Sequence, residues 1–562
     1  MENHEDNKID RSYAGLTGEN VRVALTILLI CFLANFSLSS QFGVYDDDHF
    51  LTLSPASMSS KTFFEYLKYC IAESPGGRPI GFALNAVFSF LVGRYLSVQT
   101  GYLLGWLILS FNGYLIYRIV KPLLGNQPAF VAALSYILFP ADLSKQILMH
   151  RAFVLAANTS VLLGILLYQR DTLVSRFASY LVAGLSLIIW EGPFFGFIAA
   201  PFLISNARET LLKRLCKHLA IFGGILAFTL AVRFALGEDR AKDVVTGFSE
   251  AVGRIASATW IGPWTVLQTF LTRPLSALLH PEVSSGITII LSSLILVRVL
   301  REWSKEDHEA KISIIPLVLI GGIIAAAFPY VLMYRPGYYP PTCTVGALSA
   351  VHAPAELGFA MICAAIVSLF EIWFKGSRVL GVVIACYFGL LAGFGVRVQE
   401  TSYIQSWRIE KETWKCIIRN STDAHDRTLI VIDLRDFPAV TGFSSLWVNG
   451  MSPDLQMLVE APEKWTVGPE IIAYYNGLDH ELKDGGVVLH MAATLPSMWP
   501  TLKDGNFIFF SYRDGELVRQ SGPVDIYGTK LTPKQEEKRK PWKLTRLGRQ
   551  LLEEPWENKS FL

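Results

Sequence analysis

Three consecutive carboxylates, Asp46, Asp47 and Asp48, follow soon after the first long apolar run of the chain, and His49 comes next. A carboxylate can deprotonate a hydroxyl nucleophile, and several carboxylates together can bind a divalent cation. Such a cluster does not serve apolar packing, because burial of unpaired charge is costly. We therefore expect a proton acceptor or a cation site here. The alternative is a solvated acidic collar that keeps the loop out of a membrane.

Further ionisable residues stand at the ends of later apolar runs. Arginine and histidine side chains can hold phosphate oxygens and offset the charge that develops on a phosphate leaving group. Acidic and basic groups that meet on one face at a lipid interface suggest a substrate whose phosphate is attached to a lipid. The candidates are Arg78, Asp142, His150, Arg151, Glu191, Arg335 and His352.

Simpler interpretations exist for some of these residues. Arg78 could extend its charge to lipid headgroups while its stem stays in apolar surroundings. His150 and Arg151 could anchor a helix end at the interface. Glu191 could pair locally at a helix terminus. Lys145, in the same part of the chain as His150, is expected to be solvated.

Membrane helices are the elements that must position these residues. Of 562 residues, 51% are hydrophobic and only 17% are charged. The apolar residues gather into runs of about 14 to 22, which is typical of an α-helical polytopic membrane protein. A soluble fold would need a core larger than one domain supports. We predict about 11 transmembrane helices, near residues 21–41, 97–118, 128–140, 152–169, 175–190, 192–205, 218–237, 286–300, 312–333, 354–374 and 379–396.

The basic residues of the short loops predict the orientation. Lys and Arg gather after the second, fourth, sixth, eighth and tenth predicted spans, as the positive-inside rule requires of cytoplasmic loops. The N-terminus is therefore expected in the cytoplasm and the candidate residues on the outer face. The apolar stretch 80–96 and the region 241–280, which carries Trp260 and Trp264, are predicted to lie in the outer interface.

Changes in composition divide the chain into four parts. Residues 1–20 are predicted to be a cytoplasmic leader, and residues 21–396 the transmembrane domain, with its first outer loop at 42–96. From 397 to 530, short apolar runs alternate with Gly, Pro and Asp turns, which predicts an extracytoplasmic α/β or β-rich domain. Residues 531–562 are interpreted as a basic tail, solvated and touching anionic headgroups.

Several protein classes lack support in the sequence. No GxGxxG, P-loop or GxSxG motif is present, so neither a nucleotide-driven pump nor a serine hydrolase is indicated. The seven cysteines form no CxxC pair and no Cys/His cluster typical of a zinc site. No nucleic-acid partner is expected.

Four short motifs resemble, in their order and sidedness, those of the integral-membrane C-type (GT-C) glycosyltransferase superfamily. They are the acidic stretch 45–51, the Arg78-Pro79 pair, the basic turn 117–125 and the stretch Phe139-Pro140-Ala141-Asp142. The resemblance covers the architecture of about residues 20–400. The superfamily includes protein mannosyltransferases, oligosaccharyltransferases, the lipid A aminoarabinose transferase and O-antigen glucosyltransferases.

This resemblance implies an enzyme that moves a sugar from a polyprenyl-phosphate carrier to a hydroxyl acceptor, with inversion at the sugar. The acceptor would be a cell-envelope glycan, a lipid or a protein on the outer face of a bacterial inner (cytoplasmic) membrane. Asp47 would be the general base, with Asp46 as the second choice. Asp48 would support either residue or join a divalent-cation site for Mg or Mn, whose ligands the sequence leaves unknown.

The resemblance also implies roles for residues of the other outer loops. Arg78 would face a phosphate of the donor. The remaining phosphate or donor ligands would be His150, Arg151, Arg335 and His352, and the supporting or acceptor-side residues would be Glu191, Asp142 and His49. A second acidic residue that the superfamily places in the second outer loop has no clear match here, and Asp142 is the nearest candidate.

Three alternatives belong to other classes. A lipid-linked sugar flippase or transporter should show charged or broken segments in the middle of the membrane in both halves, whereas the predicted mid-span positions are nearly all apolar. An O-antigen polymerase or ligase usually has its key arginines in one large late outer loop and lacks an acidic first loop. A scaffold that merely anchors an outer domain would not need so many spans.

Overall fold

The computed structural model describes most of the chain. The described residues are 18–45, 48–73, 77–204, 210–235, 248–280, 282–303, 312–335, 338–374, 378–433, 435, 455–460, 469–474, 480–483, 486–489, 500–513, 516–537 and 539–553.

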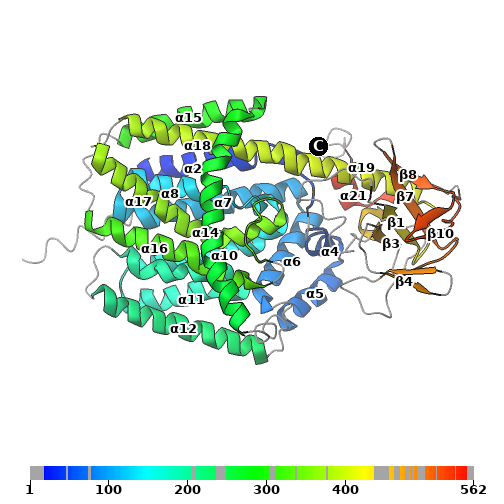
Figure 1. The fold of residues 1–562 in the computed structure, drawn as a ribbon, viewed down its shortest axis with the longest axis horizontal. Helices are drawn as coiled ribbons and strands as arrows, with labels where there is room; N and C mark the ends of the chain where they lie inside the picture. Colours follow the sequence, from blue (N-terminus) through cyan, green and yellow to red (C-terminus); the bar gives the residue numbers. More distant parts are fainter. Residues whose placement is uncertain are drawn as a thin grey trace, which may run out of the picture.

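Helices make up nearly all of the described chain as far as residue 420, and most lie along one common direction (Figure 1). Among the residues that the structure describes, eight helical segments are long and apolar enough to cross a membrane, and they make the chain a multi-pass membrane protein. These segments are α2 (Gly18–Asn35), α7 (Val98–Leu124), Leu148–Gln169, α12 (Leu211–Ala235), α15 (Val283–Trp303), Ile312–Tyr334, Ala347–Phe374 and Arg378–Asn420.

Several of these segments consist of more than one element. The third contains α9 (Leu148–His150), the π-helix η4 (Arg151–Leu155) and α10 (Ala156–Gln169). The sixth contains η7 (Ile312–Ile314), α16 (Ile315–Ala327) and η8 (Phe328–Tyr334), and the seventh contains η9 (Ala347–Ala355) and α17 (Glu356–Phe374). The last contains α18 (Arg378–Val398), the π-helix η10 (Gln399–Ile404) and α19 (Gln405–Asn420).

Eight of the predicted spans fall on these eight segments, and three fall on shorter helices. The predicted spans at 128–140, 175–190 and 192–205 correspond to α8 (Asn126–Ile137), α11 (Leu173–Ile189) and the 3-10 helix η5 (Gly192–Leu203). All three are shorter than α2, which with 18 residues is the shortest of the eight segments. The membrane assignment therefore rests on the eight longer segments.

Further helices cover one end of the bundle. Helix η1 (Ser39–Gln41) follows α2, the predicted first outer loop at 42–96 contains α3 (Asp48–Leu51), α4 (Leu53–Ser57), α5 (Ser60–Ala72) and α6 (Pro79–Arg94), and the predicted second outer loop contains η3 (Ser144–Gln146). Helix α14 (Phe248–Leu279) runs across the other helices in Figure 1 rather than along them. Its Trp260 and Trp264 are 72% and 51% exposed, which suits side chains at a membrane interface.

Small residues bring α16 and α17 into close contact. A Cβ on Gly358 of α17 would lie 2.2 Å from the backbone nitrogen of Ala326 in α16. A Cβ on Gly322 of α16 would lie 3.0 Å from the carbonyl oxygen of Gly358. In lipid, no hydrophobic effect drives helices together. The van der Waals contacts between such closely spaced backbones stabilise the helix pair instead.

The strands lie in the C-terminal region, beyond residue 428. One sheet has the order β3-β1-β7-β8, in which β1 is parallel to β3 and to β7, whereas β7 and β8 are antiparallel. These strands are β1 (Leu429–Asp433), β3 (Glu470–Tyr474), β7 (Phe507–Arg513) and β8 (Glu516–Gln520). Strand β1 is buried at all five positions, as expected for a central strand covered on both faces.

Smaller elements complete this region. The order β4-β5-β6 forms a second sheet, and β9 with β10 and β2 with β11 form two-stranded ladders. These elements are α20 (Leu455–Leu458), β2 (Val459–Glu460), β4 (His480–Lys483), β5 (Gly486–Leu489), β6 (Thr501–Leu502), β9 (Val524–Ile526), β10 (Thr529–Leu531), β11 (Lys543–Leu544) and α21 (Arg546–Leu552).

The helical part and the strand region are joined by one continuous helix. Residues 378–420 run through α18, η10 and α19, so the helix continues well past residue 396, where the sequence predicts the end of the last span. Figure 1 shows α19 reaching the sheet. Within the predicted basic tail, β11 pairs with β2, and Leu547, Leu551 and Leu552 of α21 are buried.

Candidate functional site

Asp48 is the one residue of the acidic triplet that the structure describes, since Asp46 and Asp47 lie outside the described residues. Its side chain is 0% exposed. The backbone N–H groups of Leu148 and Met149 donate to its carboxylate at 2.9 and 2.6 Å. The hydroxyl of Thr52 donates to it at 3.2 Å. These hydrogen bonds join the start of α3 to the backbone at residues 148–149, so Asp48 anchors the predicted first outer loop to the second.

Residues 43–45, which lead into the acidic triplet, are held by hydrogen bonds to Tyr102 and Tyr403. The Tyr45 hydroxyl donates to the carbonyl of Tyr403 at 3.0 Å and accepts from the N–H of Gly43 at 3.1 Å. The Tyr102 hydroxyl donates to the carbonyl of Gly43 at 2.5 Å. The Tyr403 hydroxyl donates in turn to the carbonyl of Leu143 in the second outer loop. Both neighbours of Asp46-Asp47, Tyr45 and Asp48, are therefore fixed.

Arg78 forms an ion pair with Glu191. Its guanidinium Nε and Nη2 donate to the two carboxylate oxygens at 2.8 and 2.7 Å. Arg233 Nη2 lies 3.7 Å from the same carboxylate and donates to the carbonyls of Gly77 and Leu187 at 3.0 and 2.7 Å. Two predicted site residues are thus brought together, and Arg233 at the end of α12 is a third member that the sequence analysis missed.

Charge explains the titration of Glu191, which lies in the turn between α11 and η5. Burial alone would raise its pKa, but the charge and hydrogen bonds of Arg78, with the charge of Arg233, lower the pKa to about 2. The group is therefore a carboxylate at neutral pH. Two guanidiniums against one carboxylate leave the cluster with one net positive charge.

The Arg78 cluster and the acidic loop are joined through α6. This helix begins at Pro79, directly after Arg78, and the Asn85 side chain in it donates to the carbonyl of Leu51 at 2.8 Å. Leu51 ends α3, which begins at Asp48. The acidic and the basic residues of the first outer loop therefore belong to one packed unit.

His150 and Arg151 follow the backbone that Asp48 holds. Met149, whose N–H binds Asp48, is directly followed by His150, which is buried. The π-helix η4 begins at Arg151, and π-helical turns are frequent at functional sites. The side chains of Arg151 and His49 lie outside the described residues. The structure thus places His150 beside the anchoring point of the acidic loop.

Asp142 and Lys145, in the predicted second outer loop, are buried. Asp142 accepts from the N–H and the hydroxyl of Ser144 at 2.8 and 2.6 Å and from the Ser349 hydroxyl at 3.3 Å. Lys145 is 4% exposed, pairs with Glu356 at 2.8 Å and donates to the carbonyl of Tyr136 at 2.9 Å. The expectation that Lys145 is solvated was wrong, because a buried carboxylate at the start of α17 balances its charge.

Arg335 and His352 lie in different surroundings. Arg335 is half-buried at the end of η8. His352 is 0% exposed, and its Nδ1 forms a 2.6 Å hydrogen bond with the Tyr330 hydroxyl. The imidazole is thus engaged in the interior of the helical part.

The sequence analysis missed two arginines on α14 and α18. Arg273 Nη2 donates to the Thr344 hydroxyl at 2.9 Å, and its guanidinium lies 5.0 Å from the centre of the Phe394 ring. Arg397 Nη1 donates to the Ser276 hydroxyl at 3.0 Å. The signal was present, since an arginine inside an otherwise apolar helical pattern is rare and usually functional or paired. Both side chains join α14 to neighbouring segments.

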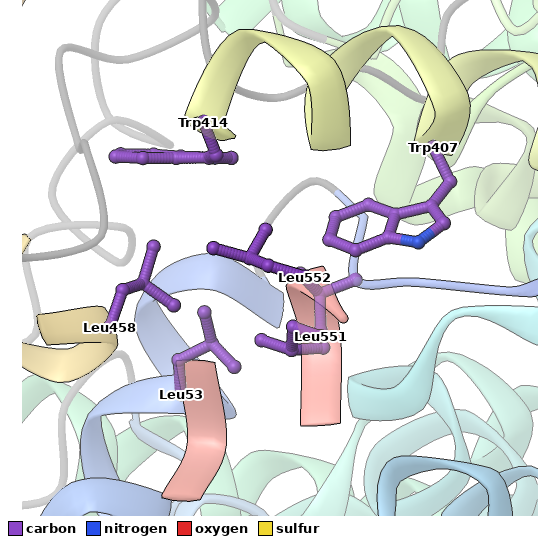
Figure 2. Close-up of a pocket in the computed structure, with 7 residues that line it drawn as sticks. Leu53, Trp407, Trp414, Leu458, Leu551 and Leu552 are labelled. Atoms are coloured by element: carbon purple, nitrogen blue, oxygen red, sulfur yellow. The ribbon is translucent and has the colours of Figure 1, made fainter. Parts of the chain in front are cut away.

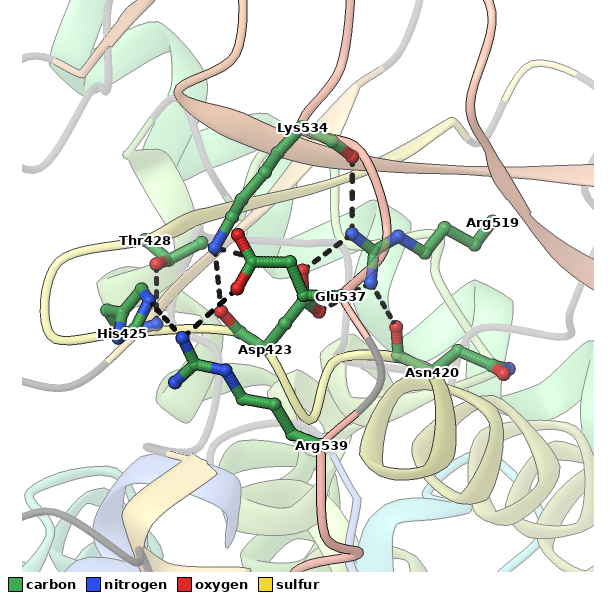
Figure 3. A network of polar contacts seen from close by, with 8 residues as sticks. All are labelled: Asn420, Asp423, His425, Thr428, Arg519, Lys534, Glu537 and Arg539. Carbon is green, nitrogen blue, oxygen red and sulfur yellow. Dashed lines mark hydrogen bonds and ion pairs between the residues drawn. The ribbon is translucent and has the colours of Figure 1, made fainter.

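The strand region has a polar network of its own (Figure 3). Arg519 donates to the two carboxylate oxygens of Asp423 at 2.6 and 2.9 Å and to the carbonyl of Asn420 at 2.7 Å. Lys534 donates to the Asp423 carbonyl at 2.8 Å. Burial opposes ionisation of Asp423, but Arg519 and Lys534 hold its pKa below the ordinary value. The network joins the end of α19 to β8 and so stabilises the junction.

Three or more His, Cys, Asp or Glu side chains that could share a metal ion are not found together among the residues that the structure describes. Asp46 and Asp47 are not among them, so the expected Mg or Mn site stays a prediction. In comparisons with known proteins, no family model, no curated protein and no solved structure matches the chain.

Proposed function

We propose that the protein is an inverting glycosyltransferase that moves a sugar from a polyprenyl-phosphate carrier to a hydroxyl acceptor. The main support is the anchoring of the acidic loop. The loop with Asp46 and Asp47 is fixed on one flank through Tyr45 and on the other through Asp48. A general base must be held at hydrogen-bonding distance from the proton it takes. A firmly anchored acidic loop at one end of membrane helices supports that use.

The proposed reaction is a single displacement. Asp47, or Asp46 in its place, takes the proton of the acceptor hydroxyl. The hydroxyl oxygen forms a bond to the anomeric carbon from the face opposite the phosphate, and the bond between that carbon and the phosphate oxygen breaks. Its electron pair leaves with the polyprenyl phosphate, and the configuration at the anomeric carbon inverts. The protonated carboxyl then releases its proton to water.

Positive charge near the loop supports a departing phosphate. The Arg78, Glu191 and Arg233 cluster keeps one net positive charge and connects to the acidic loop through α6. Preorganised cations stabilise charge that develops on a leaving phosphate. In this proposal Arg78 is held by Glu191 and contributes through the charge of the cluster. A divalent cation at the acidic triplet would supply further charge of the same sign.

The proposed setting is the outer face of a bacterial inner membrane. The lipid chain of the donor would lie in the bilayer beside the helices, and the strand region from about residue 400 would stand on the acceptor side, where it adjoins the acidic loop. The acceptor would be a cell-envelope glycan, a lipid or a protein. The proposal leaves the sugar open.

A lipid-linked sugar flippase is a second candidate. The buried ion pair of Lys145 and Glu356 favours it, because charged pairs inside membrane bundles often line transport pathways. The two candidates differ in whether a glycosidic bond is broken.

The deciding experiment uses the purified full chain in lipid nanodiscs and in sealed vesicles, with polyprenyl-phosphate sugars labelled in the sugar and a cell-envelope extract as the source of hydroxyl acceptors. A transferase releases unlabelled polyprenyl phosphate and forms labelled product of inverted anomeric configuration in nanodiscs. A flippase leaves the donor intact in nanodiscs but moves label across the vesicle membrane. Intact donor in the first assay and translocation in the second would overturn the proposal.

A further inference from the structure

Residues 42–45, which lead into the acidic triplet, lie directly against the base of the strand region. Gly43, three residues before the acidic triplet, lies under the indole of Trp407 in α19. A Cβ built on Gly43 would lie 1.8 Å from the indole Cδ2 and 2.2 Å from Cε3. These are atoms of the ring body, so a larger side chain at residue 43 cannot be accommodated by rotating a flexible tip.

Aromatic rings extend this contact along the loop. Phe42 stacks on Tyr403 with a centroid distance of 5.2 Å and packs edge-on against Tyr102 at 5.1 Å. Tyr45 packs edge-on against Tyr403 at 4.9 Å. Such pairs add about 0.5–1.5 kcal/mol each beyond the area that they bury. Tyr403 and Trp407 lie on the same continuous helix, so one rigid element holds residues 42–45.

The C-terminal helix closes the same contact from the other side. Figure 2 shows Trp407 and Trp414 of α19 facing Leu53 of the first outer loop and Leu551 and Leu552 of α21. With Val44 and Leu458, these side chains enclose a cavity of only about 10 Å³ with apolar walls. This volume is at the lower limit of the about 10–15 Å³ that a water needs, and the apolar walls offer a water no polar partner. The strand region is therefore tightly packed against the acidic loop.

We infer that Trp407 is a positioning residue for the acidic loop, and that the strand region forms part of the active site by holding that loop. The inference rests on the proposed transfer reaction. Trp407 is not expected to touch either substrate: it presses on Gly43, which leads through Tyr45 to the proposed base. Small displacements of a catalytic group can cost about 100-fold in rate. The helix continuous with the last span thus sets the geometry of the first outer loop.

The test compares Gly43→Ala, Trp407→Ala and the double variant in nanodiscs. Each single variant should lower kcat for transfer by about tenfold or more with little change of KM for the donor, because the loop is displaced while the donor site is kept. Trp407→Phe should restore most of the activity. In the double variant the new Cβ no longer meets a ring, so it should be more active than Gly43→Ala alone.

Two controls separate positioning from general damage. Trp373→Ala removes an indole that is 72% exposed at the far end of α17 and should leave transfer unchanged. Amide hydrogen exchange of residues 42–45 should rise in Trp407→Ala while exchange in α15 and α16 stays as in the wild type. If exchange rises throughout the helical part, the activities of Trp407→Phe and of the double variant decide whether Trp407 positions residues 42–45.

The outcomes distinguish this inference from the proposed function. Wild-type activity in Trp407→Ala, or a double variant no better than Gly43→Ala, would overturn the positioning role. If the wild type transfers no sugar, the proposed function fails, and hydrogen exchange alone tests the contact. In that case, unchanged protection of residues 42–45 in Trp407→Ala would overturn the positioning role of Trp407.

Discussion

Arg78 and Glu191 lie 113 residues apart in the sequence, and their side chains form two parallel hydrogen bonds of 2.8 and 2.7 Å. This pair fixes the start of α6 to the turn between α11 and η5. It therefore holds together the two outer segments that carry predicted basic and acidic site residues. Arg233 makes Glu191 the shared partner of two guanidinium groups.

Because Glu191 binds two guanidinium groups, its loss should destabilise the fold more than the loss of Arg78. Glu191→Gln leaves two guanidiniums with little compensation and should cost about 3–5 kcal/mol of stability. Arg78→Gln leaves Glu191 its second partner, Arg233, and should cost about 1–3 kcal/mol. Thermal unfolding of the purified variants in nanodiscs measures the difference. Glu412→Gln, at a side chain that is 65% exposed, should shift the midpoint little. Equal losses at Glu191 and Arg78 would contradict the asymmetry.

The same carboxylate predicts how stability depends on pH. The pKa of Glu191 in the folded protein, about 2, lies below the ordinary value of 4.5. Its ionised form therefore stabilises the fold above pH 4.5, and this contribution, on the order of 2 kcal/mol, is lost as the pH falls from 4.5 towards 2. The stability gap between wild type and Glu191→Gln should narrow over that range. A constant gap between pH 7 and pH 3 would contradict the lowered pKa.

Asp48 is predicted to act as an anchor for the backbone of the second outer loop. Asp48→Asn keeps one acceptor oxygen but loses the charge and should cost about 1–3 kcal/mol, and Asp48→Ala should cost more. Hydrogen exchange should increase at the amides of Leu148 and Met149, which donate to the carboxylate. Glu65→Gln, on the exposed face of α5, is the control and should leave both amides protected. Unchanged protection of both amides in Asp48→Ala would disprove the anchor.

If Lys145 and Glu356 act as a pair, removing both charges should restore stability that is lost when only one is removed. Lys145→Met leaves a buried carboxylate without its cation and should cost about 3–5 kcal/mol, whereas Lys145→Met with Glu356→Leu removes both charges and should recover much of the loss. Membrane abundance and unfolding midpoints of Lys145→Met, Glu356→Leu and the double variant measure the recovery. A double variant as unstable as the sum of the single ones would show that the two residues do not act as a pair.

Apolar run length and composition were enough to predict the helical part. Eight of the 11 predicted spans fall on the eight segments of the described chain that can cross a membrane, because a long apolar run has few alternatives to a helix in lipid. Boundaries were harder to predict. The helix α2 ends at Asn35, well before the predicted limit of 41. The Asn35 side chain donates there to the carbonyl of Ile137 at 3.2 Å.

Partners far apart in the sequence could not be predicted. Nothing local distinguishes Lys145, which pairs with Glu356 in the interior, from a solvated lysine. The pairing of Arg78 with Glu191, and of Asp48 with two backbone amides, depends on how the outer loops pack. Residue types indicated candidates, while only the fold determined which of them meet. For Asp46 and Asp47 the expectation still rests on sequence.

The central claim, that a first-loop carboxylate is the general base, is tested most directly by Asp47→Asn and Asp46→Asn. The measurement is transfer of label from polyprenyl-phosphate sugars by purified variants of matched abundance and unfolding midpoint. We predict that Asp47→Asn, or Asp46→Asn in its place, lowers transfer by about 100-fold or more. If the wild type transfers sugar and both variants match it, the acidic loop is not the base and the claim is wrong.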